Sequence, residues 1–448
     1  MANRALNVWM NGQLVGTWSW SKTDVHSFHY ADAWVNSLGA RPLSLSLPIP
    51  AGEKVVRGME VKNYFDNLLP DSDKIRQRMR TRFKLKSDSV QDLLGALGRD
   101  CVGAVQLLPD AQIPEGVDRI EGTPLTEEEV ERHLRAVTSE GAFEQGGEDP
   151  DDFRISIAGA QEKTALLRYQ DQWLRPHGAT PTTHIFKLPL GLVGNMRADM
   201  SASVENEWLC LRIMKALGFE VAHADMAKFG QQKVLVVERF DRRWANEKTW
   251  IARLPQEDLC QATGTSPLHK YENDGGPDIS TCLSILAGSS ESAKDKTTFA
   301  LTNLAFWLLA ATDGHAKNFS IFLLPGANYR LTPLYDILSA WPVIGSNGNQ
   351  LQLQKAKLAM ALRSKNKHTK LVEIHTRHWQ TLAQQSGVTD IFDSMIHLVE
   401  RVAPALKQVE SELPLDFPEA VWVSIKEGML QQQRIFLQGL DTLAQTTA

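Results

Sequence analysis

The sequence has 448 residues, of which 43% are hydrophobic and 23% charged, and its formal net charge is -5. A chain of this length exceeds one ordinary hydrophobic core, so we expect two or three domains or lobes. The composition is typical of a soluble globular protein. The negative charge argues against a general attraction to nucleic acid or to an anionic membrane, but leaves room for a local basic patch.

The four cysteines, at positions 101, 210, 260 and 282, lie far apart and form no C-x-x-C pair. They are expected to be reduced core residues, which argues against a zinc site or a disulfide framework. No apolar segment follows the first four residues, and the longest unbroken apolar run, Leu304 to Ala311, is too short to span a bilayer. We therefore expect a cytoplasmic protein that does not enter the membrane.

The first 110 residues are predicted to form an α+β module. Two apolar runs on either side of Asn11-Gly12 predict a β-hairpin with a type I′ turn. Further strands are expected at 28–30, 43–47 and 103–108, and helices at 61–69, 72–83 and 90–97.

The helix predicted at 72–83, with the residues just after it, carries seven cations at alternate positions between Lys74 and Lys86. Such a number of cations can bind the phosphates of nucleic acid. Alternate residues spread around a helix instead of lining one face, however, which favours a solvated surface helix. No function is assigned to it.

Residues 111–152 are polar and acidic and predict a connector that holds one helix, at 126–137. The segment 153–169 then predicts a hairpin of two strands, whose tip, from Ala158 to Lys163, has small side chains and one lysine. Such a tip can lie close over phosphates, as a glycine-rich loop does, although most hairpins with small residues at the tip are merely turns.

Lys187 ends an apolar strand predicted at 183–187, a setting in which a lysine needs an anion or must reach solvent. In kinases a strand lysine binds the ATP phosphates and pairs with a glutamate of the next helix. The helix predicted at 204–218 offers Glu205 and Glu207, and the sequence does not distinguish them. Two further strands, at 224–229 and 234–237, lead into a polar segment from Glu238 that is suited to the hinge between two lobes.

Beyond this hinge the pattern becomes helical, with helices predicted at 256–263, 278–287 and 294–311. The polar loop from Asp313 to Asn318 follows the last of them and precedes a strand-like run. A carboxylate and a carboxamide five residues apart are typical of kinase catalytic loops, in which the aspartate accepts the proton of the attacking hydroxyl and the asparagine holds magnesium. Asp336 adds a second carboxylate in an apolar frame, as expected of the main metal ligand. Taken singly, Asp313 and Asp336 also fit a helix cap and a turn.

The remaining patterns add no chemistry. The chain from residue 376 onward has apolar residues at helical spacing and predicts a helical subdomain. The histidines share no metal-ligand spacing, which argues against zinc. Ser156 lacks the G-x-S-x-G frame of the α/β-hydrolases.

Several long motifs in one order resemble the HipA family of serine/threonine-protein kinase toxins from bacterial toxin–antitoxin systems. They are RPLSLSLP (41–48), NLLPDS (67–72), FRISIAGAQEKT (153–164), TTHIFKLP (182–189), VERFDRRW (237–244), RLPQED (253–258), ATDGHAKNFS (311–320) and TPLYD (332–336). The resemblance covers nearly the whole chain. It implies an α+β, bilobal protein-kinase-like fold with an N-terminal α+β subdomain and a largely helical C-terminal lobe.

The expected organisation has four parts. Residues 1–110 form the N-terminal subdomain and 111–152 the acidic connector. Residues 153–240 form the ATP-binding lobe and hinge, and 241–448 the helical lobe with its catalytic loop at 313–318.

The resemblance also implies the site residues, for ATP and Mg²⁺ as cofactors. Asp313 is the expected catalytic base, and Asn318 and Asp336 the expected metal ligands. Nucleotide contacts are expected from Ala158, Gly159, Ala160, Gln161, Glu162, Lys163, Lys187, Glu238, Arg239, Phe240, His315, Ala316, Lys317, Asn318, Tyr335 and Asp336. Ser156 matches the serine that family members autophosphorylate, which disables them because a doubly charged phosphate repels those of ATP. The histidine follows Asp313 instead of preceding it, so His315 is not assigned the usual role of a catalytic-loop histidine.

The partners implied are a HipB-like helix-turn-helix antitoxin dimer, operator DNA reached mainly through that antitoxin, and a protein substrate. The substrate class implied is an aminoacyl-tRNA synthetase, chiefly the glutamyl enzyme, whose phosphorylation gives growth arrest and drug tolerance. The chain would also act as a co-repressor with its antitoxin.

Two alternatives remain open at this point. A small-molecule kinase of the aminoglycoside or choline type shares the spacing from Asp313 to Asn318. A co-repressor with a vestigial nucleotide pocket is the other, although it need not have kept Lys187, Asp313, Asn318 and Asp336 together.

Overall fold

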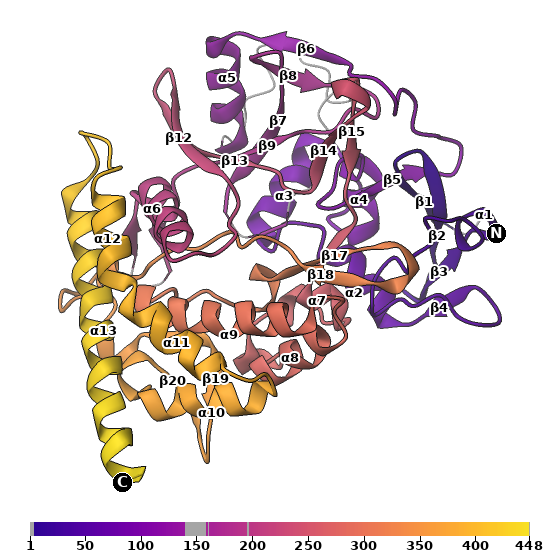
Figure 1. The fold of residues 1–448 in the computed structure, drawn as a ribbon. Coiled ribbons are helices and arrows are strands. Elements are labelled where there is room, and N and C mark those ends of the chain that lie inside the picture. Colours follow the sequence, from indigo (N-terminus) through magenta and orange to yellow (C-terminus); the bar gives the residue numbers. More distant parts are fainter. Residues whose placement is uncertain (1–3, 139–157, 160, 195–196, 448) are drawn as a thin grey trace. The chain divides into compact units, whose positions relative to one another are not determined.

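The computed structural model describes residues 4–138, 158–159, 161–194 and 197–447 (Figure 1). The chain divides into two compact units, each built from several segments. The first contains Met1–Leu188, Ala227–Lys270 and Ser320–Tyr329, and the second contains Pro189–Met226, Tyr271–Phe319 and Arg330–Ala448. Each unit is described by itself.

The first unit begins with a five-stranded antiparallel sheet in the order β4-β3-β2-β1-β5. Its strands are β1 (Arg4–Met10), β2 (Gln13–Trp20), β3 (His26–Tyr30), β4 (Val55–Arg57) and β5 (Val105–Pro109). Asn11 and Gly12 take left-handed φ values of 47° and 81°, as a type I′ turn requires, and confirm the predicted hairpin.

Four helices accompany this sheet: α1 (Asp32–Val35), α2 (Met59–Asp66), α3 (Asp73–Arg82) and α4 (Val90–Leu97). The helix α2 packs on β3 and on α4, which packs on β5. Their apolar faces enclose one core that includes Trp18, Phe28 and Phe65. The side chain of Ser72 caps α3 by accepting a hydrogen bond from the amide of Ile75, so this helix starts where the sequence predicts.

A second, six-stranded sheet follows in the first unit, in the order β12-β13-β9-β7-β8-β6. Its strands are β6 (Gly122–Leu125), β7 (Lys163–Tyr169), β8 (Gln172–Pro176), β9 (His184–Lys187), β12 (Ala224–Phe229), whose first residues lie in the second unit, and β13 (Gln232–Glu238). The helix α5 (Glu127–Thr138) packs on β6, β7 and β13 and buries Val130 and Leu134 against Phe186. The acidic segment thus supplies both an edge strand and a covering helix.

The first unit is completed by β14 (Arg242–Ala245), which pairs with β15 (Trp250–Arg253), and by β16 (Gln256–Asp258), which pairs with β17 (Ser320–Leu323). Asp258 caps the short helix α7 (Leu259–Ala262). A helix predicted over 256–263 is therefore wrong for its first three residues, which form a strand. The strand β18 (Tyr329–Leu331) runs from the first unit into the second.

The second unit is mainly helical, and its centre is α9 (Ser292–Leu309), which packs against α8 (Ile279–Ala287), α10 (Thr376–Ser386), α11 (Ile391–Glu400) and α13 (Glu419–Thr447). The helices α6 (Ser203–Ala216) and α12 (Val402–Glu410) pack on each other. Two hairpins are formed by β10 (Gly191–Val193) with β11 (Ala198–Met200), and by β19 (Lys357–Arg363) with β20 (Lys367–Lys370).

Two further sequence predictions need correction. Residues 43–47 form a turn closed by a bridge between Ser44 and Leu47 instead of a strand. The hydroxyl of Tyr30 accepts a hydrogen bond from the amide of Leu43 and donates one to the carbonyl of Leu47, so both leucines reach the core from a turn. The helix predicted at 294–311 stops at Leu309, because Ala310 is left-handed with φ of 48°.

The four cysteines are buried and none forms a disulfide, as the sequence predicts. Among the helices that the structure describes, none combines the length and the apolar character that crossing a bilayer requires.

Candidate active site

The expected catalytic loop begins where α9 ends. The left-handed Ala310 terminates the helix in the core, and the chain then turns so that Asp313 reaches solvent, with 68% of its side chain exposed. Gly314 makes this turn possible, because a Cβ atom at this position would come within 2.3 Å of the ring of Phe306. The glycine is needed here for close packing and not for a positive φ.

Two aromatic residues surround the Asp313 carboxylate. The hydroxyl of Tyr271 donates a hydrogen bond of 2.6 Å to Oδ1 of Asp313. The Nε2 atom of His315 lies 3.9 Å from the same oxygen, and the ring of His315 packs edge-to-face on Tyr271 with 4.9 Å between centroids. The carboxylate is therefore held in one orientation but open to solvent, as an acceptor for a substrate proton must be.

Asn318 is brought close to Asp336 within this unit. It ends the short 3-10 helix η5 (Ala316–Asn318) and is 4% exposed. Its Oδ1 accepts a hydrogen bond of 3.2 Å from the amide of His315, which fixes the loop. Its Nδ2 lies 3.4 Å from both the backbone oxygen and a carboxylate oxygen of Asp336. Asn318 of the loop and the Asp336 carboxylate, 18 residues apart in the sequence, thus lie next to each other.

The segment around Asp336 is held from both sides. Leu334 forms a parallel bridge with Val221 on one side, and Ser339 donates to the carbonyl of Leu309 at the end of α9 on the other. The hydroxyl of Tyr335 donates 2.8 Å to the carbonyl of Lys317. Asp336 itself is left-handed, with φ of 59°, a conformation that aspartate tolerates better than most residues. Fixed backbone on both sides keeps this carboxylate in place.

The expected phosphate-binding lysines lie in the sheet of the first unit. Lys187 on β9 is 6% exposed and lies directly opposite Lys163 on β7 in the antiparallel pair. The two expected lysines thus lie on neighbouring strands of one sheet, at paired positions.

The loop before β7 has the expected small residues. Gly159 is left-handed with φ of 112°, and Lys163 donates 2.7 Å from Nζ to the carbonyl of Ala158, which closes the loop. Gln161 donates to the carbonyl of Leu188, next to Lys187. Ser156 and Ala160 lie outside the described residues.

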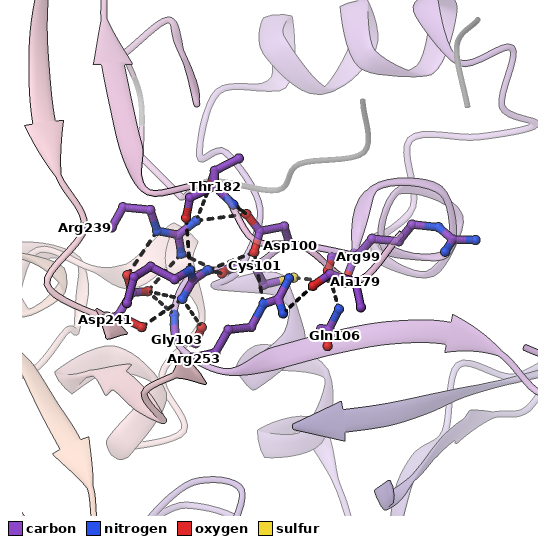
Figure 2. A network of polar contacts seen from close by, with 12 residues as sticks. Arg99, Asp100, Cys101, Gly103, Gln106, Ala179, Thr182, Arg239, Asp241 and Arg253 are labelled. Carbon is purple, nitrogen blue, oxygen red and sulfur yellow. Dashed lines mark hydrogen bonds and ion pairs between the residues drawn. The ribbon is translucent and has the colours of Figure 1, made fainter. Parts of the chain in front are cut away.

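The expected hinge follows β13. Glu238 is exposed, Phe240 is half-buried and packs edge-on against Phe322, and the Arg239 side chain is 1% exposed. The guanidinium of Arg239 is fully engaged in a buried ion network (Figure 2). Arg239 can therefore contact a nucleotide only through its backbone.

This buried ion network contains three arginines and two aspartates. Asp100 accepts from Arg239 and Arg253, each at 3.2 Å, and from Arg242 at 2.9 Å. Asp241 is bidentate with Arg239, at 3.0 and 2.8 Å. Burial alone raises the pKa of Asp100, but the three arginines outweigh it and hold the pKa well below its usual value. Burial and neighbouring Arg239 lower the pKa of Arg242 to about 10.

The network connects the N-terminal sheet with the hinge. Figure 2 shows Asp100, Cys101 and Gly103, just before β5, beside Thr182 and Arg239. Asp100 takes a hydrogen bond of 2.6 Å from the hydroxyl of Thr182, and the amide of Gly103 donates 2.7 Å to Asp241. All its members belong to the first unit, and the network joins the segment 239–242 to the residues just before β5.

The structure gives the positions of three groups of side chains to which the sequence assigns no definite partner or function. Glu205 and Glu207 both lie near the start of α6 in the second unit and both are buried, so which of them pairs with Lys187 stays open. The sequence assigns no function to Tyr271, and no local signal places its hydroxyl on a carboxylate 42 residues away. In the basic helix α3, Arg76 forms an ion pair with Asp66 and Arg78 forms one with Glu162.

Two family models match the chain. The HipA N-terminal domain matches residues 6–108, and the HipA-like C-terminal domain matches residues 155–409. The protein Y4mE of Sinorhizobium fredii is 33% identical over 419 residues, which cover 90% of this chain and 92% of that protein. The serine/threonine-protein kinase toxin HipA of Shewanella oneidensis is 28% identical over 440 residues, covering 94% and 92%.

The fold agrees with these matches. HipA of Shewanella oneidensis, solved in complex with HipB and its operator DNA, superposes with a TM-score of 0.78 at 24% identity and covers 98% of both chains. The predicted fold class, mixed α and β with a kinase-like architecture, is confirmed by this superposition. The chain belongs to the HipA family of serine/threonine-protein kinase toxins.

Proposed function

We propose that this chain transfers the γ-phosphate of ATP to serine or threonine side chains of proteins, with Asp313 as the base that receives the hydroxyl proton. One observation carries the proposal. An exposed, hydrogen-bonded carboxylate stands on the same loop as Asn318, whose amide lies 3.4 Å from the Asp336 carboxylate. Proton acceptor and metal-holding groups are the two parts that phosphoryl transfer requires of a catalytic loop.

The residues present fit Mg²⁺. No group of three or more His, Cys, Asp or Glu side chains able to hold a metal occurs in the described part of the chain. Magnesium is usually held by only one or two carboxylates together with substrate phosphates, as Asp336 and Asn318 would hold it. Because the Nδ2 atom of Asn318 faces the Asp336 carboxylate, the amide would turn to offer its oxygen to an ion held there as well. Bound magnesium neutralises charge that develops on the phosphates.

The phosphates and the adenine of the nucleotide are assigned to residues of the first unit. Lys187 and Lys163 supply positive charge for its phosphates, and the loop 158–163 supplies small residues that allow close approach. Backbone groups of 238–240 are suited to the adenine. Nucleotide contacts from His315, Ala316, Lys317 and Tyr335 belong to the same proposal.

The partners are proposed by likeness. The Shewanella structure holds HipA with HipB and operator DNA, and we propose a corresponding helix-turn-helix antitoxin for this chain, which then reaches operator DNA mainly through it and acts as a co-repressor. The proposed protein substrate is an aminoacyl-tRNA synthetase of the glutamyl type, whose loss stops growth and gives drug tolerance. Self-phosphorylation of Ser156 would switch the kinase off by placing phosphate beside the nucleotide loop.

Intact-mass measurement tests the activity. Purified full-length protein is incubated with ATP, with and without Mg²⁺, beside Asp313→Asn. We expect the mass of one added phosphate, located by fragmentation at Ser156, in the wild type with Mg²⁺ only. Wild-type protein that takes up no phosphate and transfers none to glutamyl-tRNA synthetase would overturn the proposal.

A competition of acceptors separates protein from small-molecule kinases. Wild-type protein is given labelled ATP with either glutamyl-tRNA synthetase or aminoglycosides and choline. Transfer to a small molecule alone would assign the chain to that other class.

A further inference from the structure

We propose that the N-terminal subdomain positions the nucleotide loop 158–163, with Asp71 and Arg78 as the positioning residues. The inference rests on the proposed function, since it concerns the loop assigned to the ATP phosphates. The anchor is the edge of the N-terminal subdomain formed by Pro70, Asp71 and the helix α3. All the residues involved belong to the first unit.

The first contact is made by the backbone. Pro70 forms a parallel bridge with Gly159, and the amide of Asp71 donates 3.1 Å to the carbonyl of Gly159. Gly159 needs its positive φ of 112° here, and a Cβ atom at this position would come 2.5 Å from Nζ of Lys163. A side chain at this position is therefore disfavoured mainly by the positive φ, and it would also displace the flexible end of the lysine that closes the loop.

The anchoring edge is itself fixed. Lys270 holds the Asp71 carboxylate at 2.8 Å, with both side chains about nine-tenths buried, at 12% and 11% exposure. Arg76 forms an ion pair of 2.7 Å with Asp66 and donates 2.6 Å to the carbonyl of Pro70. Contacts on both sides keep the backbone of Pro70 and Asp71 in place.

The second contact is an ion pair at the other end of the loop. Arg78 of α3 binds the carboxylate of Glu162, and its guanidinium also donates to the carbonyl of Thr138 at the end of α5. The two side chains of the pair are 16% and 27% exposed, so solvent screens them less than a surface pair. The carbonyl of Glu162 accepts from the amide of Leu188, the residue after Lys187. The ion pair thus acts next to both lysines.

The subdomain can hold the loop because it is fixed to the rest of the unit. The buried network of Asp100 and Asp241 with three arginines joins it to the hinge. A loop held at both ends has already lost its conformational entropy before the nucleotide binds. A released loop loses that entropy on binding, which weakens the affinity. Loss of the clamp, by which we mean the contacts of Asp71 and Arg78 with this loop, should therefore weaken nucleotide binding.

Charge reversal tests the clamp. The variants are Arg78→Glu, Glu162→Arg and the double exchange of both, in the full-length protein. Arg80→Glu is the matched control, because Arg80 is an exposed cation of the same helix and undergoes the same charge change. Two quantities are measured: amide hydrogen exchange of residues 158, 159 and 161–163 without nucleotide, and the Kd of a fluorescent ATP analogue with Mg²⁺.

We expect faster exchange of the loop and a Kd raised about five- to tenfold in each single reversal. The double exchange should restore both quantities in large part, and Arg80→Glu should match the wild type. Equal exchange rates in Arg78→Glu and Arg80→Glu would overturn the inference. Hydrogen exchange is measured without catalysis, so it tests the clamp independently of the proposed kinase activity. The kinase activity itself is tested by phosphorylation with the wild-type protein.

Discussion

The hydroxyl of Tyr271 donates a 2.6 Å hydrogen bond to the carboxylate of Asp313. The two residues come from different loops of the second unit, one before α8 and one after α9. The bond orients a carboxylate whose side chain is 68% exposed and which would otherwise rotate freely in water. It gives Tyr271 a direct role in presenting the proposed base.

The first prediction concerns this bond. Tyr271→Phe keeps the ring against His315 but removes the donor, and a hydrogen bond to a charged group contributes on the order of 2 kcal/mol. We expect kcat to fall about tenfold, with the KM for ATP unchanged, because the base is less often in position. Steady-state kinetics on a protein substrate measure both constants. An unchanged kcat, or a rise in KM alone, would contradict this role.

The second prediction concerns Asp336. Because its φ is 59°, Asp336→Asn preserves the backbone, since asparagine also tolerates the left-handed region. We expect a loss of at least about 100-fold in kcat, a requirement for much more Mg²⁺, and an unchanged melting temperature. Asp336→Ala should lose activity to the same extent but also melt earlier. Wild-type Mg²⁺ dependence in Asp336→Asn would remove Asp336 from the metal site.

The third prediction concerns the close approach at Gly314. A Cβ atom there would lie 2.3 Å from a ring atom of Phe306, so Gly314→Ala must push the catalytic loop away from α9. We expect a destabilisation of about 1–3 kcal/mol and a large loss of activity. Gly348→Ala is the control, because a Cβ atom at Gly348 meets nothing within 4 Å. Equal activity of the two variants would show that the catalytic loop accommodates the added methyl group without loss of function.

The sequence predicts most elements correctly where a local signal exists. The turn at Asn11-Gly12, the cap at Ser72 and the apolar strand that ends at Lys187 are each decided within a few residues. The predictions fail where distant contacts decide. Residues 43–47 alternate like a strand, but the hydroxyl of Tyr30 pins them into a turn. Gln256 and its neighbours look helical, but pairing with β17 makes them a strand.

The same distinction holds for the candidate site. The spacing of Asp313 and Asn318 is a local motif and can be read from the sequence. The contact of Asn318 with Asp336 depends on the bridge between Leu334 and Val221. The hydrogen bond from Tyr271 to Asp313 depends on the packing of two loops. The engagement of Arg239 in a buried network cannot be read from the sequence either, because Asp100 is 139 residues away.

The fourth prediction concerns Asp100, which binds three buried arginines. Three guanidinium groups and two carboxylates leave one net positive charge in the network, and Asp100→Asn raises it to two. Uncompensated buried charge costs about 3–5 kcal/mol, so we expect a marked fall in melting temperature. Asp110→Asn, the same substitution at an exposed position, is the control. Similar melting of both variants would mean that the arginines find other partners.

The last prediction follows from Glu257 on β16, which is fully buried and accepts 2.9 Å from the amide of Leu45. Burial raises the pKa of its carboxyl from 4.5 to about 8, against the lowering effect of hydrogen bonds from Ser44 and Leu45. Between these two pH values the folded chain keeps a proton that the unfolded chain has lost. Stability therefore falls as pH rises through this window, by at most about 1.4 kcal/mol per pH unit.

Glu257→Gln removes this titration and keeps an oxygen for the amide of Leu45. We expect the variant to melt at a higher temperature than the wild type at pH 8, and the difference to shrink toward pH 5. Thermal unfolding across this range measures it, with Glu419→Gln at an exposed position as the control. A difference in melting temperature between wild type and Glu257→Gln that stays constant at every pH would contradict this prediction. It would mean that the carboxyl of Glu257 is ionised in the folded chain throughout, because only a proton held by the folded state makes the difference depend on pH.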